Sequence, residues 1–223
     1  MTGQAELEWR ESVPVSTRFD DPYYSLENGL AETRHVFLDG NELPARFRDG
    51  FHVAELGFGT GLNLLAAVQA WRAAGVSGVL RYTSFEAFPM TAEDMIRSQA
   101  GFPELADIAR ELAEHWQSGA RVIDLQDLQF EMIVGDARER LPQWPGRADA
   151  WFLDGFSPAK NPELWEESLI VEVGAHTAPN GTAATYTAAG FVRRGLAAAG
   201  FSVARLPGYG RKRHMTQARK GNA

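Results

Sequence analysis

Three acidic side chains stand directly after apolar runs of this sequence, at Glu86, Asp136 and Asp154. Short apolar runs of this kind predict buried strands. Because the carboxyl ends of parallel strands meet at one edge of a sheet, we expect the three carboxylates to surround one ligand site. Such a carboxylate can accept hydrogen bonds from ribose hydroxyls, or accept the proton of an attacking amine. Any one of them could be a helix cap or a surface turn, but three in succession favour a site.

A glycine turn between a strand and a helix precedes these acids. Residues 51–63 read Phe-His-Val-Ala-Glu-Leu-Gly-Phe-Gly-Thr-Gly-Leu-Asn, and glycines at this place let backbone N–H groups approach a ligand beside the positive helix N-terminus. A dinucleotide fingerprint would need glycine in place of Leu62, and a phosphate loop would need Gly-Lys-Ser/Thr. With Glu55 two residues before the first glycine, the stretch resembles motif I of Rossmann-like S-adenosylmethionine (SAM) methyltransferases. The alternative is a helix-opening turn without a ligand.

The loop after the fourth predicted strand reads Asp154-Gly-Phe156-Ser-Pro158. It resembles the Asp/Asn-Pro-Pro-Tyr/Phe loop of amino-group methyltransferases, with Gly and Ser replacing the prolines. A carboxylate can steer the lone pair of an amine and take its surplus proton, and an aromatic face can stack on a base or attract a cationic methyl group. A proline-rich turn is the alternative, and Lys160 is either a surface charge or a phosphate contact.

Strand-like and helix-like segments alternate from residue 51 to the end, which predicts an α/β fold with a mostly parallel, doubly wound sheet and an antiparallel edge strand. The predicted strands are 51–57, 78–86, 121–125, 130–136, 148–154, 182–187, 201–206 and 214–218. The predicted helices are 61–74, one opened by Thr91, 102–115, 163–176 and 190–199. We expect a domain at 49–223 and an N-terminal extension at 1–48 that packs over the cofactor site. Within the extension, 6–9 suggests a short strand, 13–25 irregular chain, and 25–37 a helix or turn.

Composition and charge limit the class of protein. The chain has 223 residues, 44% of them hydrophobic and 23% charged, as in soluble globular domains. It has no cysteine, so we expect no disulfide, no thiolate nucleophile and no cysteine metal site, and the composition fits a reducing cytoplasm. No apolar run is long enough to span a membrane, and no signal peptide is evident.

The charge is distributed unevenly. The formal net charge is −7, yet eight Lys or Arg residues and no acid fall between Arg193 and Ala223, which leaves 14 cations against 29 anions in the rest. A basic segment on an acidic protein is typical either of a patch for a polyanion or of a solvated tail.

Several stretches together resemble one family. They are Asp20–Leu38, Ala54–Asn63, Trp151–Trp165, Tyr186–Leu196 and Gly208–Arg213. These look like the methyltransferase domain of the tRNA 5-methylaminomethyl-2-thiouridine biosynthesis enzyme. The resemblance implies a Rossmann-like fold and SAM-dependent N-methylation of the aminomethyl group of 5-aminomethyl(-2-thio)uridine at the tRNA wobble position, giving 5-methylaminomethyl(-2-thio)uridine.

In many members of that family an FAD-dependent oxidase domain follows. Because the chain contains no dinucleotide fingerprint, we expect no FAD here. The chain would then be a stand-alone enzyme or the first part of a longer one, and a stand-alone enzyme needs a separate enzyme to supply its aminomethyl substrate.

The resemblance also implies roles for individual residues. The expected cofactor-binding residues are Glu55, Gly57, Gly59, Gly61, Asn63, Glu86, Phe88, Asp136, Ala137, Tyr24, Ser25 and Asn28. The expected catalytic residues are Asp154 and Phe156. The expected tRNA-binding residues are Lys160, Arg193, Arg194, Arg211, Lys212 and Arg213. The alternatives are a small-molecule amine methyltransferase, an aminopropyltransferase, or a non-catalytic RNA-binding relative.

Overall fold

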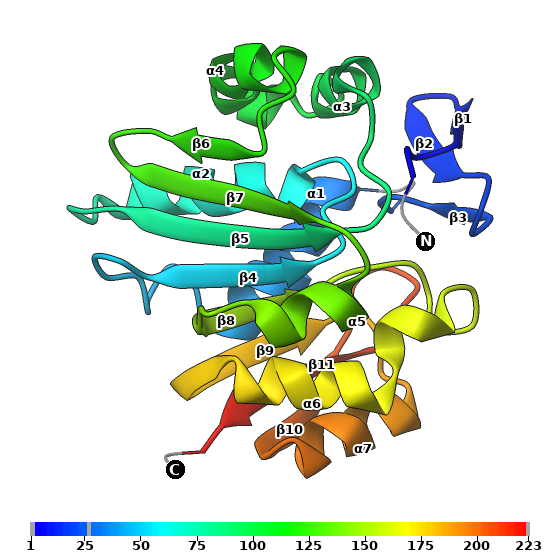
Figure 1. Cartoon of the computed structure of the whole chain (residues 1–223), viewed down its shortest axis with the longest axis vertical. Helices are drawn as coiled ribbons and strands as arrows, with labels where there is room; N and C mark the ends of the chain where they lie inside the picture. The colour runs from blue at the N-terminus through cyan, green and yellow to red at the C-terminus, as the bar shows by residue number, and fades with distance from the viewer. Residues whose placement is uncertain (1–2, 26–27, 222–223) are drawn as a thin grey trace.

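The computed structural model describes residues 3–25 and 28–221, and its centre is a twisted eight-stranded sheet (Figure 1). The strand order is β10-β11-β9-β8-β4-β5-β7-β6. The strands are β4 (His52–Leu56), β5 (Leu80–Glu86), β6 (Val122–Asp124), β7 (Leu128–Val134), β8 (Ala148–Leu153), β9 (Thr177–Thr185), β10 (Phe201–Pro207) and β11 (His214–Lys220).

The five central strands, from β9 to β7, run parallel. β6 is antiparallel to β7 at one edge, and β10 and β11 are antiparallel at the other. The predicted α/β fold, mostly parallel with an antiparallel edge, is therefore confirmed, and antiparallel strands are present at both edges.

Helices cover both faces of the sheet. They are α1 (Gly29–Thr33), α2 (Leu62–Ala74), α3 (Ala92–Gln99), α4 (Ala106–Gln117), α5 (Ala137–Arg140), α6 (Glu167–Ala175) and α7 (Gly190–Ala198). Strand residues alternate between the faces. Val53 and Phe152 pack in the core with α1, α2 and α4, while Ala54 and Trp151 pack in the core with α5, α6 and α7. The two separate cores explain why the central strands are apolar on both sides.

Local sequence signals set some helix ends. The side chain of Thr91 caps α3 by accepting a hydrogen bond from the backbone N–H of Asp94, and its hydroxyl donates to the Asp94 carboxylate. This is close to a capping box. It fixes the helix start that the sequence predicted at Thr91.

The N-terminal segment forms a separate three-stranded antiparallel sheet of β1 (Leu7–Arg10), β2 (Val13–Ser16) and β3 (Asp21–Pro22). The prediction of irregular chain over 13–25 was wrong for β2 and β3. Pro14 lacks an N–H donor, but it pairs opposite Trp9, and its carbonyl accepts a hydrogen bond from the N–H of Tyr23. A proline can hold such a place in a small sheet because only its donor is missing.

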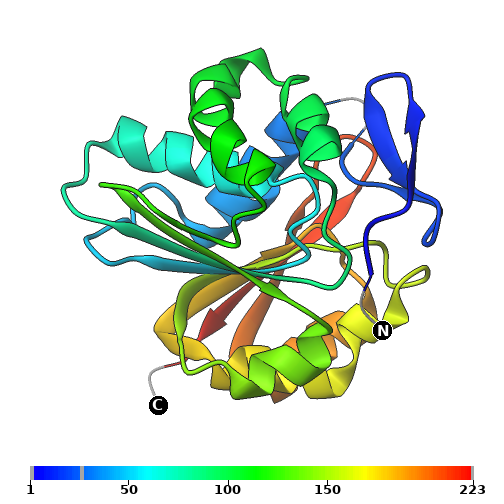
Figure 2. The same cartoon turned by 45° about the horizontal axis from the view of Figure 1, so that its top comes forward.

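This small sheet lies beside the carboxyl ends of β5 and β7, next to α3 (Figures 1 and 2). The indole Nε1 of Trp9 donates to Asp94 at 3.3 Å, and the guanidinium of Arg97 lies 3.8 Å from the Trp9 ring centroid. These contacts fasten the sheet to α3.

The chain after residue 28 is part of the main core rather than an appendage. After α1 come a π-helix at Arg34–Leu38 and a 3-10 helix at Asp39–Asn41. Val36, Phe37 and Leu38 are buried in the same core as α2. The expected extension at 1–48 thus contains two different parts, a small sheet beside the strand ends and a helical segment inside the main core.

Candidate active site

A cavity of about 1320 Å³ opens at the carboxyl ends of the central parallel strands. Its walls come from the small N-terminal sheet, the glycine turn, and the loops that follow β5, β7, β8 and β9. It is larger than a typical small-molecule pocket. It therefore has room for a cofactor and part of a second molecule.

The glycine turn forms one wall, with Gly57, Gly59 and Gly61 at φ values of 85°, 53° and 75°. A Cβ on Gly57 would lie 2.7 Å from the carbonyl oxygen of Asp154. Positive φ and close backbone approach both require glycine there. Gly57 and Gly59 line the cavity, whereas Gly61 lies behind it as the N-cap of α2.

Glu86 stands at the carboxyl end of β5 and faces the cavity. Its two carboxylate oxygens accept hydrogen bonds from the N–H groups of Gly59 (2.9 Å) and Phe88 (2.8 Å). Burial raises the pKa of Glu86, and these backbone donors oppose the shift. The carboxylate is thus held rigidly with free lone pairs available to hydroxyl groups of a ligand.

Asp136 and Ala137 line the cavity at the end of β7. The Asp136 side chain also caps α5 by accepting from the N–H of Arg138, and it pairs with the Arg138 guanidinium at 2.7 Å. This guanidinium lowers the pKa of Asp136. Asp136 is therefore both a helix cap and a wall residue, and its contact with an adenine stays a prediction.

Asp154 lines the cavity where β8 ends. One carboxylate oxygen accepts from the side-chain amide of Asn63 at 2.8 Å, and the other accepts from the N–H of Gly155 at 2.9 Å. Burial raises the pKa of Asp154 to about 6, although both hydrogen bonds act in the opposite direction. The group can thus change protonation state close to neutral pH, as a proton acceptor needs to do.

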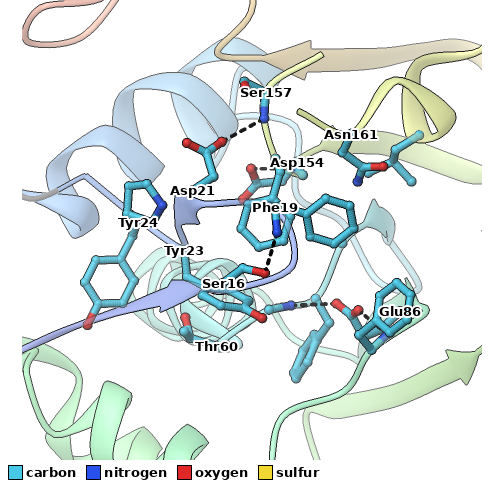
Figure 3. Close-up of a pocket in the computed structure, with 18 of the residues that line it drawn as sticks. Ser16, Phe19, Asp21, Tyr23, Tyr24, Thr60, Glu86, Asp154, Ser157 and Asn161 are labelled. Atoms are coloured by element: carbon cyan, nitrogen blue, oxygen red, sulfur yellow. Dashed lines mark hydrogen bonds between the residues drawn. The ribbon is translucent and has the colours of Figure 1, made fainter. Parts of the chain in front are cut away.

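Aromatic rings gather beside Asp154 (Figure 3). The Phe156 ring stacks on Phe19, with centroids 4.8 Å apart and planes at 26°, and meets Tyr23 edge-on at 5.0 Å. Phe88, predicted as a stacking partner, lines the same cavity and packs edge-to-face with Phe19, with ring centroids 6.0 Å apart. Phe19 and Tyr23 were missed from the sequence, where only the neighbouring tyrosines gave a signal and Tyr24 was chosen.

Residues 24–28 were expected to close the pocket, and the structure describes Tyr24, Ser25 and Asn28 but not the two residues between. Tyr24 and Ser25 line the cavity, and the hydroxyl of Tyr24 donates to the carbonyl of Ser12 at 3.0 Å. The side chain of Asn28 caps α1 by accepting from the N–H of Ala31. Asn28 is not among the lining residues, so its place differs from the one expected.

Glu55 differs most from its expected place. It is fully buried and does not line the cavity, because strand alternation turns it toward α2. Its carboxyl oxygens accept from Asn63 (2.8 Å) and from the hydroxyl of Ser84 (2.7 Å). Burial raises the pKa of Glu55 to about 8. From this buried position Glu55 supports the wall of the cavity through Asn63 and does not face a ligand.

Further polar residues near Asp154 come from distant parts of the chain and were missed. Glu32 of α1 lines the cavity and pairs with Lys212 at 2.7 Å. The hydroxyl of Tyr186 donates to the carbonyl of Gly155 at 2.7 Å, and Lys212 Nζ lies 3.9 Å from the Tyr186 ring centroid. The N–H of Ser157 donates to Asp21 at 2.9 Å. No sequence spacing signals these contacts.

Only two of the six basic residues expected to meet tRNA line the cavity. Arg211 and Lys212 line the cavity; Lys160, Arg193, Arg194 and Arg213 do not. Lys160 pairs with Asp20 and Asp21 of the N-terminal segment at 3.6 and 3.4 Å, instead of standing open for a phosphate. Arg193 donates to the carbonyl of Ala188 at 3.3 Å, while Arg194 and Arg213 are exposed.

These walls fit SAM. The glycine turn leaves room that side chains would fill, Glu86 offers carboxylate oxygens to a ribose, and the acidic wall suits a cationic sulfonium. Glu86, Phe88, Asp136 and the turn at 57–60 would hold the cofactor.

Within residues 3–25 and 28–221, none of the helices has the length and apolar character that crossing a bilayer requires.

Comparison with known proteins agrees with this site. A family model described as "S-adenosyl-L-methionine-dependent methyltransferase" matches residues 103–221. The "tRNA 5-methylaminomethyl-2-thiouridine biosynthesis bifunctional protein MnmC" of Caulobacter vibrioides is 46% identical over 97% of this chain, and the protein of that name from Aeromonas hydrophila is 44% identical over 95%. The chain spans only 38% and 34% of these two proteins.

Solved structures support the same assignment. The crystal structure of MNMC2 from Aquifex aeolicus is 25% identical, has a TM-score of 0.77, and covers 99% of this chain and 72% of its own. TrmN from Thermus thermophilus, at 16% identity, TM-score 0.50, and 82% and 47% coverage, shares the fold. The family resemblance seen in the sequence is confirmed: the chain belongs to this family of S-adenosyl-L-methionine-dependent methyltransferases.

Proposed function

We propose that this chain methylates the primary amine of 5-aminomethyluridine, or of its 2-thio form, at the wobble position of tRNA. The proposal rests on the names of relatives that the chain matches over nearly all of its own length, and on one feature of the site. That feature is Asp154, a half-buried carboxylate beside an aromatic cluster at the wall of the cavity.

The residues around Asp154 suit an amine nucleophile. An amine attacks only through a free lone pair, so it must be neutral and correctly oriented. The Asp154 carboxylate, held by Asn63 and Gly155, can accept an N–H hydrogen, orient the lone pair and take the surplus proton after attack. SAM supplies the electrophilic methyl group when bound. Burial of the site strengthens these interactions because less water screens them.

The aromatic cluster of Phe19, Tyr23 and Phe156 suits a pyrimidine. Base stacking on aromatic side chains is worth about 1–3 kcal/mol per base. Phe156 lies two residues after Asp154, so a base stacked on it would carry a short side arm toward the carboxylate. We therefore propose that Phe156 contacts the uracil ring.

The tRNA backbone would be held by the basic turn near the mouth of the cavity. Arg211 and Lys212 line the cavity, and Arg213 is exposed beside them. Phosphate contacts of this kind make binding dependent on salt. Another enzyme, or another domain, would supply the aminomethyl group, and the reaction would take place in the cytoplasm. The expected division into a covering segment at 1–48 and a methyltransferase domain at 49–223 is kept only for the small N-terminal sheet, because Leu30, Val36, Phe37 and Leu38 pack in the main core.

The test is transfer of a labelled methyl group from SAM to tRNA that carries 5-aminomethyluridine, followed by nucleoside analysis. We expect 5-methylaminomethyluridine as the product, and no product from the same tRNA with an unmodified wobble uridine. Labelling of a small amine, or of tRNA at another position, would contradict the proposal.

A further inference from the structure

Two carboxyl groups share one side-chain amide, that of Asn63, which lines the cavity. The side-chain N–H₂ of Asn63 donates to Glu55 at 2.8 Å and to Asp154 at 2.8 Å. The amide oxygen of Asn63 accepts from the hydroxyl of Thr33 at 2.9 Å. With both its hydrogens and its oxygen engaged, the Asn63 amide is locked in one orientation and links α1, β4 and the loop after β8.

The two carboxyl groups have unequal surroundings. Glu55 is fully buried, and its carboxyl accepts hydrogen bonds from the Asn63 amide and from the Ser84 hydroxyl. The Tyr82 hydroxyl is also buried and lies near Glu55. Of the two carboxyl groups that act on Tyr82, Glu55 has the larger effect and Asp154 the smaller. A neutral Glu55 could therefore donate its proton toward this hydroxyl oxygen.

Asp154 is better placed to carry charge. It faces the cavity and accepts a hydrogen bond from the N–H of Gly155, and the positive charge of Lys212 favours its ionised form by lowering its pKa. The other titratable groups near it are Glu32, Tyr186 and Tyr82. Because two adjacent carboxylates resist ionising together, the proton they share should remain on the one that is less well solvated.

We propose that Asn63 is the positioning residue of the site, and that it holds a neutral Glu55 on one side and an ionised, proton-accepting Asp154 on the other. This inference rests on the proposed function for the role of Asp154, but the state of the carboxyl groups can be measured without any substrate. It gives Asn63 and Glu55 a task different from the cofactor contacts expected from the sequence.

The decisive measurement is a carboxyl ¹³C NMR titration of the free protein, with resonances assigned through Glu55→Gln and Asp154→Asn. We expect Glu55 to be protonated at pH 7 and Asp154 to titrate near pH 6. In Asn63→Ala the Asp154 transition should move upward by roughly one pH unit, since a donor to the charged form is lost. An ionised Glu55 at pH 7, or an unmoved Asp154, would overturn the proposal.

Thermal unfolding gives an independent measure. The pKa of Glu55 in the folded state is about 8, above its unfolded value, so the folded state binds more protons between roughly pH 4.5 and 8. Its stability contribution is full below that window and is lost as pH rises through it. The melting temperature of Glu55→Gln minus that of the wild type should therefore increase as pH rises. A constant difference would contradict a neutral Glu55.

Kinetics separate positioning from cofactor binding. In Asn63→Ala the acid limb of the kcat profile should move up by about one pH unit, a roughly fivefold loss at pH 6, with SAM affinity changed less than about threefold. Glu55→Ala should lower kcat. Glu55→Gln keeps the hydrogen bonds of a neutral carboxyl, so it should retain most of the kcat that Glu55→Ala loses. Weaker SAM binding with an unmoved acid limb would sink the positioning role. If the wild type does not methylate the modified tRNA, the proposed function fails while the titration still decides the state of Glu55.

Discussion

The two ends of the cavity are built in different ways. The proposed cofactor end, which is the turn at 57–60 with Glu86, Phe88 and Asp136, comes from the first turns after β4, β5 and β7. The proposed substrate end is gathered from segments spread over most of the chain, namely Phe19, Glu32, Asp154, Phe156, Tyr186 and Lys212. The cofactor end therefore follows from the strand order, whereas the substrate end needs contacts between distant segments.

Two carboxylates of the cavity, Asp136 and Asp154, also differ in what sets their pKa. Asp136 has a lowered pKa because its own helix supplies Arg138, so it stays ionised. The pKa of Asp154 is raised by burial, so it can exchange a proton. A fixed charge suits binding and a labile proton suits catalysis, and the comparison teaches that burial by distant segments distinguishes the two acids.

Asp154→Asn should have the largest effect. It removes the proton acceptor while keeping the shape, so kcat should fall by about 100-fold or more. SAM affinity, measured by calorimetry, should change little. In the wild type, kcat should fall as pH drops through about 6, because Asp154 becomes protonated there. The matched variant Asp136→Asn should weaken SAM binding instead, and equal kinetic defects in the two variants would break the comparison.

Gly57→Ala should damage both ends at once. Its Cβ would clash with the carbonyl of Asp154 at 2.7 Å, and its φ of 85° is unfavourable for alanine. We expect a loss of about 1–3 kcal/mol in the free energy of unfolding, together with weaker SAM binding and lower kcat.

The matched control for that variant is Gly75→Ala. Gly75 has a φ of 64° and open space at its Cβ. It should cost about 1 kcal/mol or less and leave SAM affinity and kcat as they are. A functional loss in this control equal to that of Gly57→Ala would show that strain alone explains the effect.

Phe19→Ala and Phe88→Ala test the boundary between the ends. Phe19 stacks on Phe156 and Phe88 follows Glu86. Loss of one stacking ring, worth about 1–3 kcal/mol, should raise the KM for tRNA in Phe19→Ala and the Kd for SAM in Phe88→Ala. The reverse pattern would mean that the ends are wrongly divided.

The smallest effects concern the basic residues outside the cavity. Arg213 is exposed, so Arg213→Ala should make tRNA binding less dependent on salt. The slope of the logarithm of the binding constant against the logarithm of the salt concentration should become smaller by about 1. Lys160 already pairs with Asp20 and Asp21, so Lys160→Ala should leave that slope unchanged. A lower slope for Lys160→Ala, measured by filter binding across salt concentrations, would restore Lys160 as a phosphate contact.

The sheet, the glycine turn and the acids at the strand ends could be predicted from the amino-acid sequence, because they depend on local periodicity and on the rule that parallel strands place their ends together. The sequence also indicated Asp154 and Phe156 through a local loop pattern.

The surroundings of these residues depend on contacts between distant segments, which the sequence does not show. Glu55 faces α2 instead of the cavity, Asn63 joins two carboxyl groups, Phe19 lies on Phe156, and Lys160 is paired with the N-terminal segment. Each depends on which distant segments meet and on how deeply a group is buried. Burial also sets the pKa of Asp154, because desolvation depends on everything packed around a group and not on its neighbours in sequence.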